Sequence, residues 1–437
     1  KVYATASGTL PNGKPVVVNS DGTVSVVDGP PAPTVYVNSP GAYSTGSAYD
    51  SNSEKIVIAY NDGANSYKGT AVVVTVSGTS LSFGTPVIYN ESASGGDLTV
   101  VFDSNSNKVV ILYKNEGNSS YGTAVVGTVS GTGISFGTAV VFASSSSSVL
   151  TSAFDSNLNK VVVAGRINNK GQAIVGTVSG TDISFGSAAT YESGAATYNS
   201  MVFDSNSNKI VIAFQDDNDG GDGKAVVATV SGTNISFGSV AEFTTDNAVA
   251  VHATFDSSSN KVLIVWLVYP GYAGKAVVAT VSGTSISYGT VPSSFGDANS
   301  LTSAYNAATN KHILFFRDNA SPYYGMVVQA TVSGTNVSFS SEAALNDFST
   351  TLPMSSSYDS VQQKVVLNYK NATTTQQVAA VYTDVAANLT AENYIGMTPS
   401  AYPDGAGAEI DTKGAINTEQ SGLTAGQSYY VQTDGTI

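Results

Sequence analysis

The chain has 437 residues, of which only 11% are charged, with a formal net charge of −14 at pH 7 and no cysteine. DNA or RNA would be repelled by this acidic balance, which no cluster of Lys and Arg offsets, so nucleic acid is excluded as a partner. Disulfides and thiolate metal sites are excluded as well. No apolar run approaches the roughly 20 residues that a membrane-spanning helix requires.

The chain opens with a small β-element. Asp21 and Gly22 lie between the apolar runs 15–19 and 23–27, and an Asp-Gly pair in this setting predicts a β-hairpin. Residues 29–33 are rich in proline, which predicts a stiff linker. We therefore assign residues 1–28 to an N-terminal β-hairpin module.

Two phrases then recur along the chain, and successive copies lie about 50 residues apart, a period typical of repeat architectures. One is the turn Asp-Ser-Asn-Ser-Asn-Lys or a variant of it, and the other is Thr-Val-Ser-Gly-Thr. The turn starts at Asp50, Asp103, Asp155, Asp204, Asp256, Asn306 and Asp359, and the second phrase at Thr75, Thr128, Thr177, Thr229, Thr280 and Thr331.

Each full repeat contains four strand candidates, which in the second copy are residues 98–102, 108–113, 123–129 and 134–142. Val, Ile, Tyr and Phe dominate them, as half-buried strands favour, and no sustained 3.6-residue period predicts a helix. Four antiparallel strands in a unit of this length match a propeller blade. The fold prediction is thus all-β, with a seven-bladed β-propeller over residues 34–385; an open β-solenoid is the alternative.

The ends of the repeat favour a closed ring over the solenoid. The seventh copy lacks the Ser-Gly-Thr and Ser-Phe-Gly phrases, whereas Tyr36 precedes Asp50 by the distance at which Tyr89 precedes Asp103. The segment around Tyr36 is therefore predicted to supply the missing outer strand of the last blade, which would pair the two edges.

Residues 388–437 leave the repeat and form a second small β module, assigned to the C-terminal end of the chain. Residues 426–437 align without gaps on residues 13–24, and the alignment stops just after the hairpin turn. We therefore expect this module to be incomplete and the natural chain to continue beyond Ile437.

Two features suggest calcium. The repeated turns place oxygen-bearing side chains at alternate positions, but they have Lys108 where a calcium loop needs Gly and Lys114 where it needs Glu. A hairpin turn capped by Asx side chains explains them better. A Gly-rich loop in one repeat could hold Ca²⁺ through four carboxylates, although a solvated acidic loop is the commoner case. Its candidate ligands are Asp216, Asp217, Asp219 and Asp222. No other cofactor is expected.

Catalysis is poorly supported. His252 and His312 lie in different repeats with strand-like neighbours, and no metal-binding spacing involves them. Acidic residues occur in most turns, and none forms a pair distinguished by its spacing. Trp266 lies in an apolar run and reads as core. We expect no catalytic residue and a non-enzymatic protein.

The loops differ in how much they vary. Blade geometry places the repeated turns on one face, and the second-to-third and fourth-to-first loops on the other. The second-to-third loops differ between repeats and carry tyrosines, which offer apolar area with a polar tip. The candidate ligand-binding residues are Tyr67, Tyr121, Tyr269, Tyr272, Tyr323 and Tyr324. Such variation indicates either partner binding or drift in unconstrained loops.

The recurring phrases resemble those of repeat-containing structural proteins of marine bacteriophages. Residues 392–396 and 421–436 are similar to a module that ends many phage structural proteins. The resemblance implies a virion protein of the tail or surface fibres, located on the virion or otherwise extracellular, and it supplies no catalytic residues.

Three hypotheses follow. The first is a fibre or tail protein whose propeller binds a host cell-surface glycan or protein, assembled as a homo-oligomer with other virion subunits. The second is a purely structural or decoration subunit. The third is a polysaccharide-degrading enzyme with carboxylates on the variable face.

Overall fold

The computed structural model describes residues 1–19, 21–27, 33–37, 42–382 and 394–412. The chain divides into two compact units, one formed by Ala32–Tyr382 and the other by Lys1–Pro31 together with Thr383–Ile437. All regular elements described are strands, apart from the short 3₁₀ helices η1 (Gly63–Asn65) and η2 (Glu116–Asn118). Within the described part of the chain, no helix is long and apolar enough to cross a membrane.

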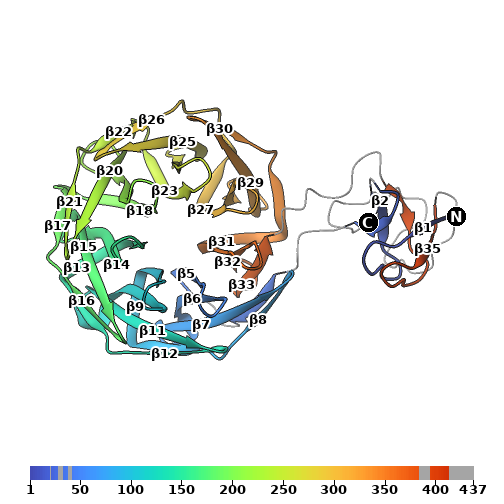
Figure 1. Cartoon of the computed structure of the whole chain (residues 1–437), viewed down its shortest axis with the longest axis horizontal. Coiled ribbons are helices and arrows are strands. Elements are labelled where there is room, and N and C mark those ends of the chain that lie inside the picture. Colours follow the sequence, from blue (N-terminus) through green and yellow to red (C-terminus); the bar gives the residue numbers. More distant parts are fainter. Residues whose placement is uncertain (20, 28–32, 38–41, 383–393, 413–437) are drawn as a thin grey trace. The chain divides into compact units, whose positions relative to one another are not determined.

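Ala32–Tyr382 is a β-propeller, in which small sheets follow one another around a ring (Figure 1). The ends of the innermost strands are set by the repeated Asp or Asn residues. The innermost strands are β5 (Thr45–Asp50), β9 (Val87–Asp103), β13 (Val140–Asp155), β18 (Ala196–Asp204), β23 (Ala248–Asp256), β27 (Ala298–Asn306) and β31 (Ala343–Asp359).

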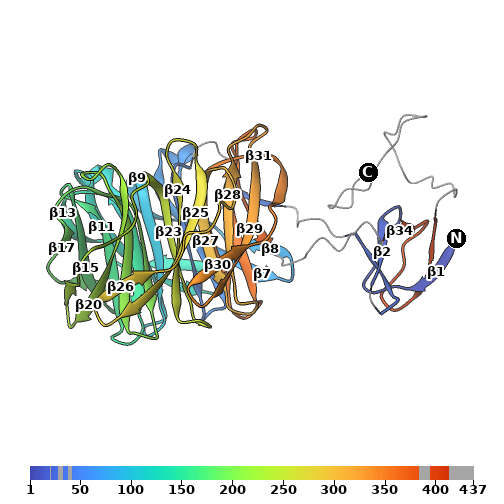
Figure 2. The same cartoon turned by 90° about the horizontal axis from the view of Figure 1, so that it is seen from above.

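Each innermost strand pairs antiparallel with a second strand, which pairs with a third (Figure 2). The second strands are β6 (Lys55–Asp62), β10 (Lys108–Asn115), β14 (Lys160–Ile167), β19 (Lys209–Asp216), β24 (Lys261–Val268), β28 (Lys311–Asp318) and β32 (Lys364–Asn371). The third strands are β7 (Lys68–Ser77), β11 (Tyr121–Ser130), β15 (Lys170–Ser179), β20 (Asp222–Ser231), β25 (Ala273–Ser282), β29 (Tyr324–Ser333) and β33 (Gln377–Tyr382).

The outer edge differs from the sequence expectation. The single strand predicted at 134–142 is broken into β12 (Gly133–Phe136) and the first part of β13, and both pair with β11. The break falls at Gly137, whose backbone lies against the next repeat. Equivalent short strands are β8 (Ser80–Phe83), β16 (Asp182–Phe185), β21 (Asn234–Phe237), β26 (Ser285–Tyr288) and β30 (Asn336–Phe339), and separate outer strands are β17 (Ala189–Glu192) and β22 (Ala241–Thr244).

The repeated acidic turns are Asx turns, as predicted. In the first copy the Asp50 side chain accepts hydrogen bonds from the backbone N–H groups of Asn52 and Ser53, at 2.9 and 3.1 Å. The residue before the conserved Lys position has a left-handed backbone, for example Asn107 with φ 54°, a conformation that Asn tolerates better than most residues. These bonds explain the repeated phrase without a metal ion.

The Ser-Phe-Gly and Ser-Gly-Thr phrases meet between neighbouring repeats. A Cβ atom added to Gly238 would lie 1.9 Å from the carbonyl oxygen of Thr284, which belongs to the Ser-Gly-Thr turn of the next repeat. Only glycine permits this approach. The same contact recurs at Gly84, Gly137, Gly186 and Gly289.

The innermost strands are joined around the ring by short polar side chains. Thr99 and Ser152 hydroxyls lie 2.8 Å apart, and Thr302 and Ser356 hydroxyls 3.1 Å apart. The ends of the repeat also meet, since Ser357 donates to the Ser47 hydroxyl at 2.8 Å.

A strand from the N-terminal side completes the last sheet. β4 (Thr34–Val37) pairs antiparallel with β33, with Thr34 opposite Ala379 and Val35 opposite Val378, as the position of Tyr36 predicts. Each junction between repeats encloses an apolar cluster. Trp266 is fully buried in one of them, in agreement with the sequence.

The second unit combines both flanks of the chain. Its strands are β1 (Val2–Thr5), β2 (Pro15–Val18), β3 (Val24–Val26), β34 (Tyr394–Met397) and β35 (Gly407–Ile410). The predicted hairpin of β2 and β3 is present. However, β1 pairs with β35 and β2 with β34, so the described parts of the flanks form one unit rather than two. Long-range pairing of this kind leaves no local pattern. The hairpin predicted at 426–437 lies outside the described residues.

Candidate functional site

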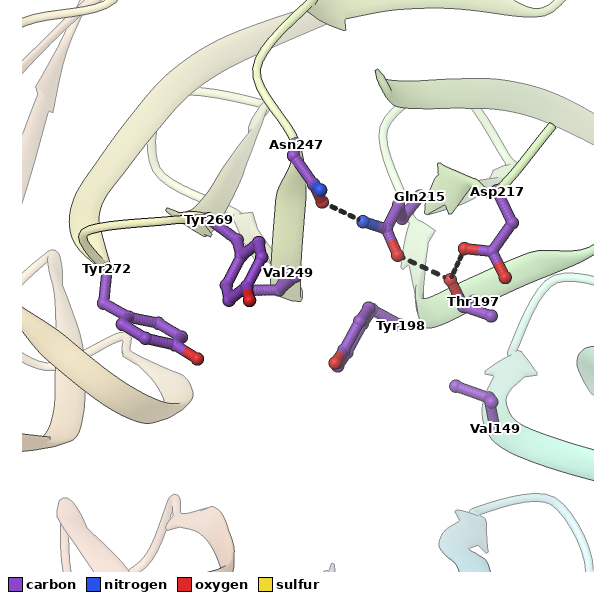
Figure 3. Close-up of a pocket in the computed structure, with 9 residues that line it drawn as sticks. All are labelled: Val149, Thr197, Tyr198, Gln215, Asp217, Asn247, Val249, Tyr269 and Tyr272. Atoms are coloured by element: carbon purple, nitrogen blue, oxygen red, sulfur yellow. Dashed lines mark hydrogen bonds between the residues drawn. The ribbon is translucent and has the colours of Figure 1, made fainter. Parts of the chain in front are cut away.

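A functional candidate is an open pocket of about 570 Å³ at the ends of the strands opposite the Asx turns. This is the face that carries the variable second-to-third loops. Elements of three consecutive repeats line the pocket, and Figure 3 shows their side chains around a common space. The lining residues are Val149, Thr197, Tyr198, Gln215, Asp217, Asn247, Val249, Tyr269 and Tyr272.

Backbone bulges in the innermost strands shape the lining of this pocket. The register between β18 and β19 shifts between Thr197 and Ser200, and Tyr198 has a left-handed φ of 46°. Val149 in β13 and Ala250 in β23 have left-handed φ values at corresponding shifts. Bulges redirect side chains and are common beside functional sites, and a left-handed Tyr or Val is costly enough to require support from its surroundings.

Part of this support comes from neighbouring repeats. The backbone N–H of Val149 donates to the Asp97 carboxylate at 2.7 Å, and its carbonyl accepts from the Asn199 side chain at 3.4 Å. Burial raises the pKa of Asp97, and the hydrogen bond from Val149 partly opposes this rise. The bulge at Val149 is therefore hydrogen-bonded to both neighbouring repeats.

Three tyrosines form the aromatic part of the pocket. Tyr269 and Tyr272 lie edge to face, with ring centroids 5.6 Å apart. Tyr198 and Tyr269 are 43% and 49% exposed, so their rings are accessible to a ligand. All three point into the same space in Figure 3. Burial raises the pKa of Tyr198, with smaller contributions from Tyr272 and Asp217.

Polar side chains form the facing wall. Gln215, which is 5% exposed, donates through Nε2 to Asn247 Oδ1 at 2.6 Å. The Thr197 hydroxyl lies 2.7 Å from Gln215 Oε1 and 2.9 Å from Asp217 Oδ1. Because each group is held by another, the wall is ordered before any ligand binds, which lowers the cost of binding.

Two of the six predicted tyrosines, Tyr269 and Tyr272, line the pocket. Tyr67 instead packs on Tyr43, with centroids 5.0 Å apart and hydroxyls 3.2 Å apart. Tyr323 stacks under the Arg317 guanidinium, 4.5 Å from its ring centroid. The remaining two, Tyr121 and Tyr324, begin strands β11 and β29 away from the pocket lining.

The acidic loop contains a lysine where a cation would bind. The Lys224 ammonium lies 2.8 Å from Asp216 Oδ2 and 2.7 Å from Asp219 Oδ2. Burial alone would raise the pKa of Asp216, but the hydrogen bonds from Lys224 and Asn218, together with the charge of Lys224, lower that pKa overall. Asp217 turns to Thr197, and the described residues contain no group of three or more His, Cys, Asp or Glu placed to hold a metal. Two of the four predicted ligands, Asp216 and Asp219, are therefore paired with Lys224, and calcium binding by this loop stays a prediction.

Both histidines lie within strands, His252 in β23 and His312 in β28. His312 is fully buried, with Nδ1 2.6 Å from the Thr254 hydroxyl and Nε2 3.8 Å from Asp256 Oδ2. Burial lowers its pKa, and Asp256 partly counteracts this effect. Neither histidine lines the pocket.

Burial lowers the pKa of His252 to about 4, which predicts acid sensitivity. In the unfolded chain this histidine has a pKa of about 6.5. Between pH 4 and pH 6.5 the unfolded chain therefore binds a proton that the folded chain does not. The contribution of His252 to stability is therefore fully present above pH 6.5 and falls by up to about 3 kcal/mol as the pH is lowered to 4. Chemical denaturation of the wild type and His252→Gln across this range checks the prediction. We expect the variant to lose less stability on acidification, and parallel curves would contradict the assignment.

The pattern of the sequence did not predict a role for Tyr198, Thr197, Gln215 and Asn247. Tyr198 belongs to an innermost strand, where tyrosine is an ordinary strand residue, and only the bulge exposes it. Gln215 is the last residue but one of the second strand β19 and is buried. Differences between the repeats could have identified part of this site. When the repeats are aligned, Gln215 and Asp217 occupy the positions of Arg166 and Asn168 in the third repeat.

The sequence matches no protein-family model and no curated protein. Among solved structures, the chain is similar to the NanB sialidase of Streptococcus pneumoniae, with a TM-score of 0.46 and 10% identity over 82% of this chain and 71% of that chain. It is also similar to the Dos1 propeller, with a TM-score of 0.49 and 10% identity over 84% of this chain and 81% of that chain. Similarity at this level concerns the fold, and neither protein's activity bears on this chain.

Proposed function

We propose that the propeller is a non-enzymatic binding module that takes a carbohydrate of a cell-surface glycan in the pocket of Tyr198, Tyr269 and Tyr272. The observation that carries the proposal is the arrangement of three tyrosine rings, the exposed Tyr198 and Tyr269 and the partly buried Tyr272, opposite an ordered row of amide, hydroxyl and carboxylate groups. Sugar rings present apolar faces and hydroxyl edges, which these two walls complement. A pocket of about 570 Å³ is within the range of small-molecule sites.

The charge pattern supports binding rather than glycoside hydrolysis. Most glycosidases use two carboxylic side chains that flank the scissile bond. Of the nine residues that line the pocket, only Asp217 carries a carboxyl group. Detectable cleavage of a bound glycan that is lost in Asp217→Asn would favour the enzyme instead.

The proposal predicts which tyrosines matter. Replacing Tyr269 and Tyr272 together by Ala should weaken binding at least about thirtyfold, because aromatic anchors of this kind are typical hot spots. Glycan-array screening of the full chain, followed by calorimetric titration of the best ligand, measures the effect.

Tyr323→Ala is the matched control, since Tyr323 and Tyr272 are both left-handed loop tyrosines, with φ of 63° and 59°, and only Tyr272 lines the pocket. Unchanged binding by the double variant, or no bound glycan on the array, would contradict the proposal. A protein ligand for the same face would be indicated if host-cell binding required the tyrosines but no glycan bound.

We further propose that the ring has seven blades and that the protein is a virion fibre or tail subunit which presents the variable face to a host cell. The blade number is supported by the strand pairing, because the innermost strand at each of the seven Asx turns pairs with a second strand, which pairs with a third. The virion setting rests on the resemblance of the repeated phrases to phage structural proteins, as does assembly into homo-oligomers with other virion subunits. Electron microscopy of the native assembly tests it, and burial of the variable face against other subunits would favour a structural or decoration role.

A further inference from the structure

The pocket has a distinct charge character. Asp217 is exposed and is the one charged side chain among the nine lining residues, which include no Lys, Arg or His. The chain as a whole carries a net charge of −14. A ligand in this pocket therefore meets a carboxylate with no cation beside it.

The internal hydrogen bonds decide which groups remain for a ligand. Gln215 is used at both ends, because Oε1 faces the Thr197 hydroxyl and Nε2 donates to Asn247. The single Thr197 proton is shared between Gln215 and Asp217. Asp217 keeps carboxylate oxygens that can accept from a ligand, and the Asn247 Nδ2 group can donate to one.

From this inventory we infer that the pocket selects a non-acidic sugar whose hydroxyl or amino groups donate to Asp217, and that it rejects uronic, sialic and sulfated sugars. The inference rests on the proposed carbohydrate function. Hydrogen bonds to an ionised acceptor are stronger than those between neutral groups, so a donor on the ligand gains from Asp217. A carboxylate or sulfate at the same place would be repelled and would leave Asp217 without a partner.

Matched sugars test this selectivity. Glycosides of glucose, glucuronic acid and glucosamine, and the corresponding galactose series, differ at one substituent each. We expect the acidic member of a series that binds to be at least about tenfold weaker than the neutral member. Asp217→Asn, which keeps the side-chain shape, should reduce this difference to less than about threefold and weaken binding of the amino sugar.

Asp246→Asn is the control, since Asp246 is an exposed carboxylate of a neighbouring loop that does not line the pocket. It should keep the selectivity of the wild type, and thermal unfolding establishes that each variant is folded. An acidic sugar that binds as tightly as its neutral partner, or a difference unaffected by Asp217→Asn, would overturn the inference while leaving the carbohydrate function intact. Failure of every sugar to bind would instead remove the proposed function itself.

Discussion

Replacing Tyr36 by Ala is expected to lower the free energy of unfolding of the propeller by about 3 kcal/mol, the usual cost of deleting a packed aromatic ring. Tyr36 belongs to β4, the strand that enters from the N-terminal side and pairs with β33. Its ring stacks on Phe83 at a centroid distance of 5.3 Å and meets Tyr60 edge to face at 5.7 Å. Both partners belong to the first repeat. One side chain therefore joins the beginning and the end of the ring.

Two companion variants isolate the cause. Tyr36→Phe keeps both ring contacts, and the Tyr36 hydroxyl is buried without a hydrogen-bond partner, so we expect a change below about 1 kcal/mol. Tyr89→Ala removes the ring at the corresponding position of the continuous strand β9, where closure is not involved, and should cost about as much. Denaturant unfolding of the three variants measures these differences. If Tyr89→Ala destabilises and Tyr36→Ala does not, then β4 does not close the ring in solution.

The fold was predictable because each repeated phrase encodes a local structure that depends on its own residues. An Asx turn requires Asp or Asn at its first position wherever it occurs, and the hydrogen bonds of Asp50 recur at each later copy. Gly238 and its equivalents mark the contact between repeats, although their partner was not evident from the sequence. The broken outer strand at 134–142 was missed for the same reason, since the break falls at Gly137, whose neighbour Thr181 belongs to the next repeat.

The site was predictable only in part, because its face follows from topology whereas its pocket depends on details of single repeats. Tyr269 and Tyr272 were found because they lie in a variable loop. Tyr67 fulfils the same criterion, yet Tyr43 takes up one side of its ring. Tyr198 reaches the pocket through a bulge that inserts one extra residue into a strand. Neither a bulge nor a side-chain partner is encoded by a repeated phrase.

The two faces of the propeller thus have different tasks, and this division predicts where substitutions are tolerated. The face of the repeated turns sets the spacing between repeats, through contacts in which glycine meets a backbone carbonyl. The opposite face can then vary from one repeat to the next without loss of the ring. Substitutions of equal size should therefore have unequal effects on the two faces, and the contact of Gly238 offers the sharpest comparison.

Gly238→Ala should lower the free energy of unfolding by about 3 kcal/mol, at the upper end of the usual cost of overpacking. The added methyl group would lie 1.9 Å from the Thr284 carbonyl oxygen, which cannot move without the turn that contains it. Ser340 is the natural comparison. Its backbone N–H donates to the Gln329 carbonyl at 2.9 Å, as that of Gly238 does to Val227, but the repeat that follows lacks the Ser-Gly-Thr turn. A side chain is tolerated at Ser340 because the following repeat has no Ser-Gly-Thr turn whose carbonyl would meet it.

Ser340→Ala should accordingly change stability by less than about 1 kcal/mol, because it removes only an exposed hydroxyl. This hydroxyl accepts from the Gln329 backbone N–H and donates to the Ser341 carbonyl, both at 3.0 Å. Denaturant unfolding of both variants, with equal m-values as the sign that the unfolding reaction is unchanged, compares the two positions directly. Equal stabilities of Gly238→Ala and Ser340→Ala would mean that the repeats can shift apart at little cost. In that case the Gly-to-carbonyl contacts would not set the geometry of the ring, and the uniformity of that face would require a different cause.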